Sequence, residues 1–386
     1  MYQKILIRYG ELVLKKKNRK TFINHLANNI KHILGEKPEV EFDRMYVSYS
    51  QQNLENLKFV FGISSYSPVL VVQNNLEAFK ASLDNLLLEQ TKTFKIAARR
   101  NFKGFEYNSN ELNHLLGSYL LKKYNQIGNL KVDVHNPDQI FYLEVRQKAT
   151  YIFSNYLQGL GGLPVGSSGK VLHLISGGFD SPVAAWQMMK RGLKVDFLTF
   201  LTPPQTDEKT LAKINGLVQQ LNKYQITSNL IIADYSQLMN YISFVSKESY
   251  KITLMRRSFY RIAEKIALKN NILAISNGDN LGQVASQTLE SMNVIGKATM
   301  MPILRPLLSF DKNQIINLAK EIKTYQISII QANETCELFA PKEPVTKPSL
   351  EIALALEQEL SSIFELEQEL LNNFLEYKKV KLTHEN

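Results

Sequence analysis

Four short apolar runs in the C-terminal part of the chain are separated by segments with helical spacing, and this alternation constrains the fold most strongly. The runs cover residues 171–175, 195–200, 230–233 and 272–276. Continuous apolar strands are typical of parallel sheets, because helices cover both faces of such a sheet. The pattern therefore predicts an α/β domain with a doubly wound parallel sheet.

The first predicted strand is followed by a loop with the sequence Ser-Gly-Gly-Phe-Asp-Ser-Pro at residues 176–182. Adjacent glycines let the backbone come close to a ligand and adopt a positive φ angle. Ser181 can cap the next helix, and Pro182 suits its first turn because proline has no N–H to lose. Unpaired N–H groups at a helix start bind anions, so we expect a pyrophosphate site here. The chain has no Walker A sequence, which excludes an ordinary P-loop NTPase.

The first 160 residues mix strand-like and helix-like patterns. Up to about residue 60 they predict a small α+β unit, with a helix that ends at Gly35. The predicted strands are 2–8, 40–49, 69–72, 93–97, 130–135 and 140–145, and the predicted helices are 22–34, 76–88 and 110–124. The last two strands flank an Asn-Pro-Asp turn sequence, which predicts a hairpin.

A segment rich in glycine and serine, residues 157–170, is the clearest linker in the chain. Its Gly-Leu-Gly-Gly-Leu-Pro sequence nearly matches a dinucleotide-binding fingerprint, but Pro164 stands where the third glycine belongs and a strand follows. We therefore discard that match. The acidic residues from 350 onward have helical spacing, and we expect them to pack against their own domain.

The formal net charge is +10, and most of it comes from the first 165 residues, which hold 22 basic and 14 acidic side chains. The basic residues cluster at 15–20 and 92–103. A polyanion such as nucleic acid would explain this asymmetry through phosphate neutralisation, whereas a solvated basic face is the simpler alternative. Aromatic residues interleave the second cluster and favour RNA, although they would serve equally well as core residues. They are Phe94, Phe102, Phe105 and Tyr107.

Several classes of protein are excluded. Cys336 is the only cysteine, so the chain cannot form an internal disulfide, a four-cysteine zinc site or a Cys-x-x-Cys pair. Six histidines without close pairing argue against a dedicated metal site. No apolar run approaches the roughly 18 residues of a membrane span, and charge interrupts the N-terminal apolar stretch as a signal peptide would not allow. We expect a cytoplasmic protein.

The loop at 176–181 resembles the PP-loop of ATP pyrophosphatases, which cleave ATP between the α- and β-phosphates. Further motifs extend the likeness over nearly the whole chain, and together they resemble the tRNA 4-thiouridine synthetase family. These motifs are Arg8-Tyr-Gly-Glu-Leu12, Lys17-Asn-Arg19, Met255-Arg256-Arg257, the glycine-rich stretch 278–288, Arg305-Pro-Leu and the proline-rich stretch 341–348.

The resemblance implies three domains: a ferredoxin-like domain at 1–56, a THUMP domain that grips tRNA at 57–160, and a PP-loop catalytic domain at 161–386. It implies ATP-dependent transfer of sulfur to uridine 8 of tRNA, with Mg²⁺, and relatives also deliver sulfur to the carrier protein of thiazole synthesis. About forty residues follow Pro348, too few for the rhodanese domain of longer members. A separate cysteine desulfurase would then supply sulfur, and family members suggest a homodimer.

The implied mechanism has two steps. The uridine C4 oxygen attacks the α-phosphate and releases pyrophosphate, and sulfur then replaces AMP at C4. Asp180, Cys336 and Lys312 are the expected catalytic residues. The expected nucleotide-binding residues are Leu174, Ile175, Ser176, Gly177, Gly178, Asp180, Ser181, Thr199, Phe200, Arg256, Gly278 and Gln287.

Most of these roles have a structural alternative. Asp180 would hold Mg²⁺ or orient the loop, or would simply cap a helix. Arg256 would reach the nucleotide or lie on the surface, as we expect for Arg257. Gly278 and Gln287 would contact ligand or form a turn and cap. Cys336 would accept sulfur or be an inert thiol.

Two other functions fit the same motifs. One is a different PP-loop tRNA-modifying enzyme, such as a lysidine-type ligase, an amidotransferase or a 2-thiouridine synthase. The other is a tRNA-binding module without catalysis, although the complete loop sequence argues against it.

Overall fold

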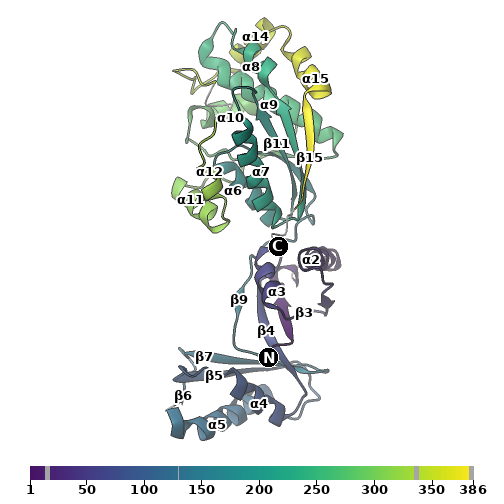
Figure 1. Ribbon diagram of the computed structural model, residues 1–386, viewed down its shortest axis with the longest axis vertical. Helices are drawn as coiled ribbons and strands as arrows, with labels where there is room; N and C mark the ends of the chain where they lie inside the picture. The colour runs from purple at the N-terminus through teal and green to yellow at the C-terminus, as the bar shows by residue number, and fades with distance from the viewer. Residues whose placement is uncertain (14–17, 129, 334–338, 382–386) are drawn as a thin grey trace. The chain divides into compact units, whose positions relative to one another are not determined.

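The computed structural model describes residues 1–13, 18–128, 130–333 and 339–381. The chain divides into two compact units, unit 1 (Met1–Gly162) and unit 2 (Leu163–Asn386), and the division falls within the glycine-rich segment 157–170 of the sequence; Figure 1 labels the elements of each unit. Among the described helices, none combines the length and the apolar character needed to cross a membrane.

Unit 1 is built on one mixed sheet with the strand order β2-β3-β1-β4-β8-β7-β5-β6, and β9 pairs with the start of β4. The strands are β1 Lys4–Arg8, β2 Glu39–Val40, β3 Arg44–Ser48, β4 Ser65–Val72, β5 Thr93–Arg100, β6 Lys131–Val132, β7 Gln139–Val145, β8 Thr150–Phe153 and β9 Leu157–Gln158. The helices are α1 Gly10–Val13, α2 Arg19–Leu34, α3 Gln51–Asn56, η1 Leu57–Phe59, α4 Leu76–Leu86 and α5 Ser109–Gly128. Helix α2 ends where predicted, because Gly35 adopts a φ of 74° and its N–H bonds to the carbonyl oxygen of Lys31.

Strand β4 belongs to both halves of this sheet. Its first five residues pair antiparallel with β1, beginning with Ser65 opposite Arg8. Its last three residues pair antiparallel with β8, ending with Val72 opposite Thr150. The predicted ferredoxin-like and THUMP parts therefore share one strand, and the boundary predicted between residues 56 and 57 precedes that strand.

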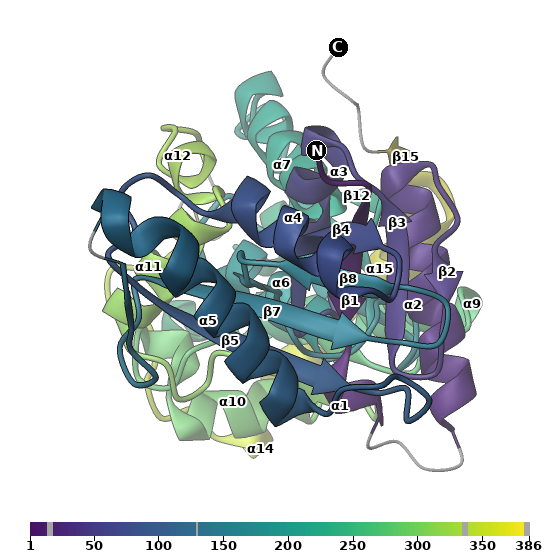
Figure 2. The ribbon, with the colours of Figure 1, turned by 90° about the horizontal axis from the view of Figure 1, so that it is seen from below.

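The hairpin predicted at residues 130–145 is wrong. Strands β6 and β7 both pair in parallel with β5, which lies between them. A parallel neighbour requires a crossover, and α5 supplies it between β5 and β6 by packing over β5 (Figure 2). The turn then carries the chain across the start of β5, where Asp138 accepts hydrogen bonds from the N–H groups of Lys92 and Thr93. Strand β7 forms its hairpin with β8 instead.

The aromatic residues of the second basic cluster belong mainly to the core. Phe94 is fully buried, and Phe105 and Tyr107 pack against the same apolar cluster between the sheet, α4 and α5. The core interpretation is therefore confirmed for these three rings. Beside them, exposed basic side chains include Lys92, Arg99 and Lys103.

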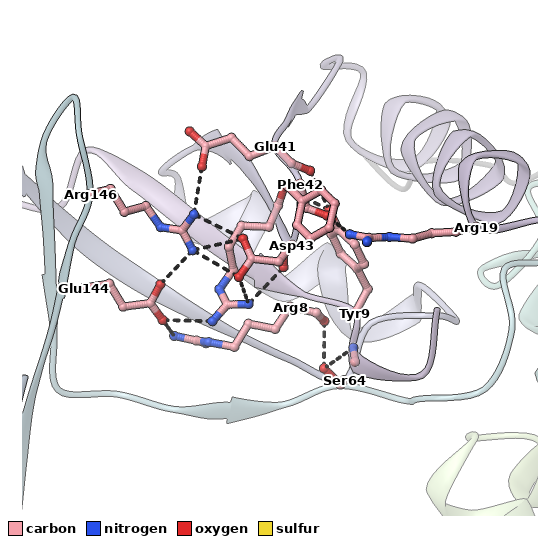
Figure 3. A network of polar contacts seen from close by, with 11 residues as sticks. Arg8, Tyr9, Arg19, Glu41, Phe42, Asp43, Ser64, Glu144 and Arg146 are labelled. Carbon is pink, nitrogen blue, oxygen red and sulfur yellow. Dashed lines mark hydrogen bonds and ion pairs between the residues drawn. The ribbon is translucent and has the colours of Figure 1, made fainter. Parts of the chain in front are cut away.

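A buried carboxylate on β7, Glu144, faces three guanidinium groups (Figure 3). Its oxygens lie 3.2 Å from Arg44, 3.3 Å from Arg146 and 3.8 Å from Arg8, and its side chain is only 5% exposed. Asp43 contacts Arg44 and Arg146 from the other side, each at 3.1 Å. Arg8, Arg44 and Glu144 belong to β1, β3 and β7, and Asp43 and Arg146 directly adjoin β3 and β7, so the network joins the two halves of the sheet.

Arg8 and Arg19, which belong to the N-terminal motifs, each stack on an aromatic ring. The Arg8 guanidinium lies 4.4 Å from the ring centroid of Tyr156, and its Nη1 donates to the hydroxyl of Ser67 at 3.0 Å. The Arg19 guanidinium lies 3.8 Å from the centroid of the exposed Phe42. Arg8 is thus a buried structural residue of unit 1.

We predict that Glu144→Ala destabilises unit 1 by about 3 to 5 kcal/mol, because it leaves buried guanidinium groups without their shared counterion. Hydrogen exchange of the backbone amides of β3 and β7 measures the loss. The control is Glu39→Ala, which removes a well-exposed pair with Lys4 and should cost at most about 1 kcal/mol. Equal protection of these strands in both variants would contradict the prediction.

Unit 2 contains the predicted doubly wound sheet, with the strand order β14-β13-β10-β11-β12-β15. The strands are β10 Lys170–Leu174, β11 Lys194–Leu201, β12 Thr227–Asp234, β13 Ile275–Ser276, β14 Ile303–Leu304 and β15 Leu375–Lys381. The helices are α6 Asp180–Lys190, α7 Glu208–Asn222, α8 Ser236–Ile242, η2 Glu248–Tyr250, α9 Lys251–Lys269, η3 Ala285–Gln287, α10 Leu289–Gly296, α11 Lys312–Glu321, α12 Tyr325–Ser328, α14 Leu350–Glu359 and α15 Ile363–Asn373. All strands except β15 run parallel to their neighbours.

The strand order reverses at β10, which positions the site. The chain moves from β10 to β11 and β12 in one direction, and then crosses back to β13 on the other side of β10. Right-handed crossovers therefore place α6 and α7 on one face and α9 on the opposite face. A crevice opens at such a switch point, beyond the carboxyl ends of the strands.

The acidic C-terminal residues pack on α9 through buried ion pairs. Two guanidinium nitrogens of Arg257, Nε and Nη2, contact Glu357 at 2.9 Å, and Arg261 contacts Glu357 at 2.5 Å and Glu367 at 2.6 Å. The expectation of a surface position for Arg257 is wrong, since that residue is 3% exposed. The helical prediction for this region also missed β15, which pairs antiparallel with β12 at the sheet edge.

Candidate active site

The glycine-rich loop joins β10 to α6 and is shaped by a hydroxyl group. Helix α6 begins at Asp180 after Phe179, and no side chain caps it. Ser181 instead turns back, where its Oγ accepts the N–H of Ser176 at 3.0 Å and lies 3.2 Å from the carbonyl oxygen of Ser176. The predicted caps at Ser181 and Asp180 are therefore wrong, because both residues are already helical. Neither loop glycine adopts a positive φ, contrary to the prediction.

A buried histidine holds the loop against the neighbouring strand. His173 on β10 lies 2.8 Å from the carbonyl oxygen of Ser181 through Nε2, and 2.6 Å from the hydroxyl of Ser276 through Nδ1. A carbonyl oxygen can only accept, so Nε2 carries the proton. Burial lowers the pKa of His173 to about 4, and the ring is neutral near pH 7.

Gly278, just after β13, approaches the start of α6 more closely than any side chain would allow. A Cβ atom at this position would lie 2.7 Å from the backbone nitrogen of Ser181 and 2.9 Å from the carbonyl carbon of Asp180. The glycine therefore permits contact between two backbone segments, in addition to lining the cavity described next.

A cavity of about 290 Å³ lies at the switch point, over the carboxyl ends of β10 and β11. One wall is apolar and includes Phe200 and Phe259, whose rings stack with centroids 3.9 Å apart. The cavity brings together eleven of the predicted site residues. They are Leu174, Ile175, Ser176, Gly177, Asp180, Ser181, Thr199, Phe200, Arg256, Gly278 and Gln287.

The polar side of the cavity contains a buried carboxylate between two arginines. Asp279 Oδ1 contacts Arg256 at 2.6 Å, and its Oδ2 lies 3.4 Å from Arg305. Burial alone would raise the pKa of Asp279, but the two positive charges hold it below its ordinary value. Arg256 also donates to the hydroxyl of Ser286 at 3.1 Å, so this arginine is not a plain surface residue.

Asp180 is a carboxylate placed at the positive end of α6. Its Oδ2 accepts a hydrogen bond from Gln283 Nε2 at 3.1 Å, whereas its buried Oδ1 has no partner among the described residues. Burial raises the pKa of Asp180, although Gln283 and the charge of Lys312 oppose this shift. Lys312 begins α11 and lies 5.7 Å from the ring centroid of Phe179 in the loop.

Three of the predicted site residues are not among the residues that line the cavity. Gly178 is part of the loop and Lys312 lies beside it, but neither lines the cavity. Cys336 lies outside the described residues. The described residues that flank its segment in the sequence are Asn333 and Phe339. The carbonyl oxygen of Asn333 accepts from Thr210 at 3.0 Å, and the ring centroid of Phe339 is 5.9 Å from Lys251 Nζ.

Sequence reasoning gave no role to four polar residues near the cavity. Asp279, Gln283 and Ser286 belong to the 278–288 motif, in which the sequence predicts roles only for Gly278 and Gln287. Asn277 precedes it and bonds to both Tyr260 and Asp279. The polar character of this short stretch after a predicted strand was the available signal.

The loop, the switch point and the cavity define a nucleotide-binding α/β protein of the PP-loop class. Residues 166–362 match the family described as thiamine biosynthesis protein (ThiI). Residues 4–67 match the ThiI ferredoxin-like domain, and residues 76–155 match the THUMP domain. The chain belongs to the ThiI family of tRNA sulfurtransferases.

Relatives match along their full length. A probable tRNA sulfurtransferase of Mycoplasmopsis agalactiae is 60% identical, with coverage of 99% of this chain and 100% of the relative. One of Mycoplasmopsis synoviae is 59% identical over 96% of this chain and 98% of its own. A solved structure of a 4-thiouridine synthetase–RNA complex with bound ATP matches with a TM-score of 0.91 and 35% identity, covering 99% of this chain and 100% of that one.

We predict that Gly278→Ala displaces the loop, because the new methyl group would meet backbone rather than a movable side chain. Overpacking of this kind costs about 1 to 3 kcal/mol, and we expect ATP affinity to fall at least about tenfold. Calorimetric titration with ATP measures the effect. Gly216→Ala in α7 is the control, since its nearest contact, at 3.5 Å, is ordinary. If Gly278→Ala binds ATP with unaltered affinity, the backbone at residue 278 and the start of α6 can move apart without harm, and the prediction is wrong.

We also predict that His173 weakens unit 2 in acid. The unfolded chain binds a proton near pH 6.5, whereas folded His173 does so only near pH 4, so stability falls as the pH drops through this range. The full effect is about 3 kcal/mol. Denaturation followed by the fluorescence of Trp186, the single tryptophan, should show a shallower acid dependence for His173→Gln. His135→Gln, at an exposed position, should leave the dependence unchanged.

Proposed function

We propose that this tRNA sulfurtransferase uses ATP to convert uridine 8 of tRNA to 4-thiouridine. The observation that carries the proposal is the cavity at the switch point, where the PP-loop and eleven predicted residues converge. The family assignment and the related structure with RNA and ATP support the same chemistry.

In the first step the uridine C4 oxygen attacks the α-phosphorus of ATP. The bond to the β-phosphate breaks, and pyrophosphate leaves with the electron pair. The N–H groups of the loop and the positive end of α6 would stabilise the departing charge, because they are fixed in place before the reaction. Ser181 preserves the shape of this cradle through its bonds to Ser176.

The adenosine would occupy the apolar side of the cavity. The stacked rings of Phe200 and Phe259 provide a flat wall there, and backbone groups at the ends of β10 and β11 are available to the base. Arg256 would approach the phosphates while Asp279 fixes its direction. Lys312 would add positive charge from the outer side of the loop.

The residues present fit a Mg²⁺ ion beside the phosphates. No described residue donates a hydrogen bond to the buried Oδ1 of Asp180, and a carboxylate oxygen is a ligand that Mg²⁺ prefers. When bound, the ion would neutralise the charge of the pyrophosphate. The described residues include no cluster of three His, Cys, Asp or Glu that would hold a metal ion without help, so the nucleotide would complete the site.

In the second step sulfur attacks C4, the C4–O bond breaks, and AMP leaves. We propose Cys336 as the sulfur acceptor, in the form of a persulfide. The described neighbours of its segment support this role: Asn333 bonds to Thr210, and Phe339 lies near Lys251, the residue before Ile252. Both Thr210 and Ile252 line the cavity. If the outer sulfur of this persulfide attacks C4, the base stays joined to Cys336 through an S–S bond. An external thiol must break that bond, since the chain has no second cysteine.

Several finer features belong to the same proposal. A cysteine desulfurase would supply the sulfur, and the family name supports a second delivery to the sulfur carrier of thiazole synthesis. We retain the domain limits 1–56, 57–160 and 161–386, a homodimer, and a cytoplasmic location, where tRNA is available.

The test incubates the protein with unmodified tRNA, Mg-ATP and sulfide. We expect AMP and pyrophosphate in equal amounts, together with the absorbance of 4-thiouridine. Release of ADP, or modification at a different nucleoside, would refute the proposal. With persulfide as donor we expect Cys336→Ser to lose the thiolation, because its oxygen cannot carry the sulfur. Full activity of Cys336→Ser would favour a lysidine-type ligase or an amidotransferase, which need no cysteine.

A further inference from the structure

We infer that Gln283 supplies a second protein oxygen, beside Asp180, for the divalent cation that accompanies ATP. This inference rests on the proposed function. Each of the two side chains carries one buried oxygen that lacks a hydrogen-bond donor among the described residues, Oδ1 of Asp180 and Oε1 of Gln283. An aspartate and a side-chain amide also hold Mg²⁺ together in protein kinases, so this pair of ligands suits phosphoryl chemistry.

A hydrogen bond fixes the two side chains against each other. Gln283 Nε2 donates to Asp180 Oδ2 at 3.1 Å. The amide oxygen Oε1 of Gln283 can only accept hydrogen bonds, and so can Oδ1 of Asp180 when its carboxyl is ionised. Burial of such acceptors without a partner is costly, and a cation bound by both oxygens removes that cost.

The backbone delivers Gln283 to this position by folding back on itself. Gly282 adopts a φ of 79°, a conformation that favours glycine, and its N–H donates to the carbonyl oxygen of Gln287 at 2.8 Å. The N–H of Gln287 in turn donates to the carbonyl oxygen of Val284 at 2.9 Å. Val284 and Gln287 line the cavity while Gln283 contacts Asp180, so the same turn contributes to the cavity wall and places Gln283 beside Asp180.

The surrounding charges favour a cation at this position. Asp279 is neutralised by Arg256 and Arg305. Asp180, by contrast, has no ion pair within the described part of the chain, although Lys312 acts on it from a distance. A carboxylate left alone beside the proposed pyrophosphate site would repel the nucleotide, whereas a divalent ion between them attracts both. The ion should therefore bind with the nucleotide and only weakly without it.

Two variants separate a ligand from a residue that merely positions Asp180. Gln283→Leu removes both the oxygen and the N–H donor. Gln283→Glu keeps an oxygen at the same reach but removes the donor to Asp180. Gln147→Leu, on an exposed turn of unit 1, is the control for the substitution itself.

The experiment titrates the full-length protein with Mn²⁺ in the presence of α,β-methylene ATP, which cannot be cleaved at the reacting bond, and follows Mn²⁺ by electron paramagnetic resonance. We expect Gln283→Leu to weaken Mn²⁺ binding about tenfold or more. Gln283→Glu should bind Mn²⁺ at least as tightly as the unaltered chain, and Gln147→Leu should match it.

Unaltered Mn²⁺ affinity in Gln283→Leu, with the analogue still bound, would overturn the inference and leave the proposed function standing. Equal loss in the Leu and Glu variants would also overturn it, because the hydrogen bond rather than the oxygen would then matter. Failure of the unaltered chain to bind the analogue at all would instead refute the proposed function.

Discussion

The start of α6 and the segment after β13 lie so close together that no side chain fits between them. Gly278 makes this contact possible, and His173 reinforces it through hydrogen bonds to Ser181 and Ser276. The loop between β10 and α6 is therefore held from outside by the segment around β13 as well as from within by Ser181, and neither of its own glycines adopts a positive φ. The same contact brings the Asp279 segment to the cavity, so the loop and the polar wall pack directly against each other.

Buried carboxylates that face several arginines recur in both units. Glu144 joins strands of unit 1, Glu357 joins the C-terminal helices to α9, and Asp279 directs Arg256 at the cavity. Guanidinium groups suit this use because each presents donors in a planar fork to more than one acceptor. These arginines are held inside the fold, whereas basic side chains near β5 such as Lys92, Arg99 and Lys103 are exposed.

The sequence predicted features that depend on local pattern. The apolar strands, the loop between β10 and α6, and the Gly35 helix end were all predictable from neighbouring residues. Features set by distant contacts were not: β15 is a charged edge strand without the apolar pattern of the others, and β5 inserts between β6 and β7 although it precedes both. The cavity residues were largely found through family motifs, whereas Gln283 required the fold, because its partner Asp180 lies 103 positions away.

The shared strand β4 has a consequence for how this part of the chain can be divided. One end of β4 is hydrogen-bonded to β1 and β9, and the other to β8. A cut between the two parts would strip β4 of one set of partners and expose unsatisfied backbone groups. Residues 1–158 are therefore expected to fold as one unit, although two family models cover them.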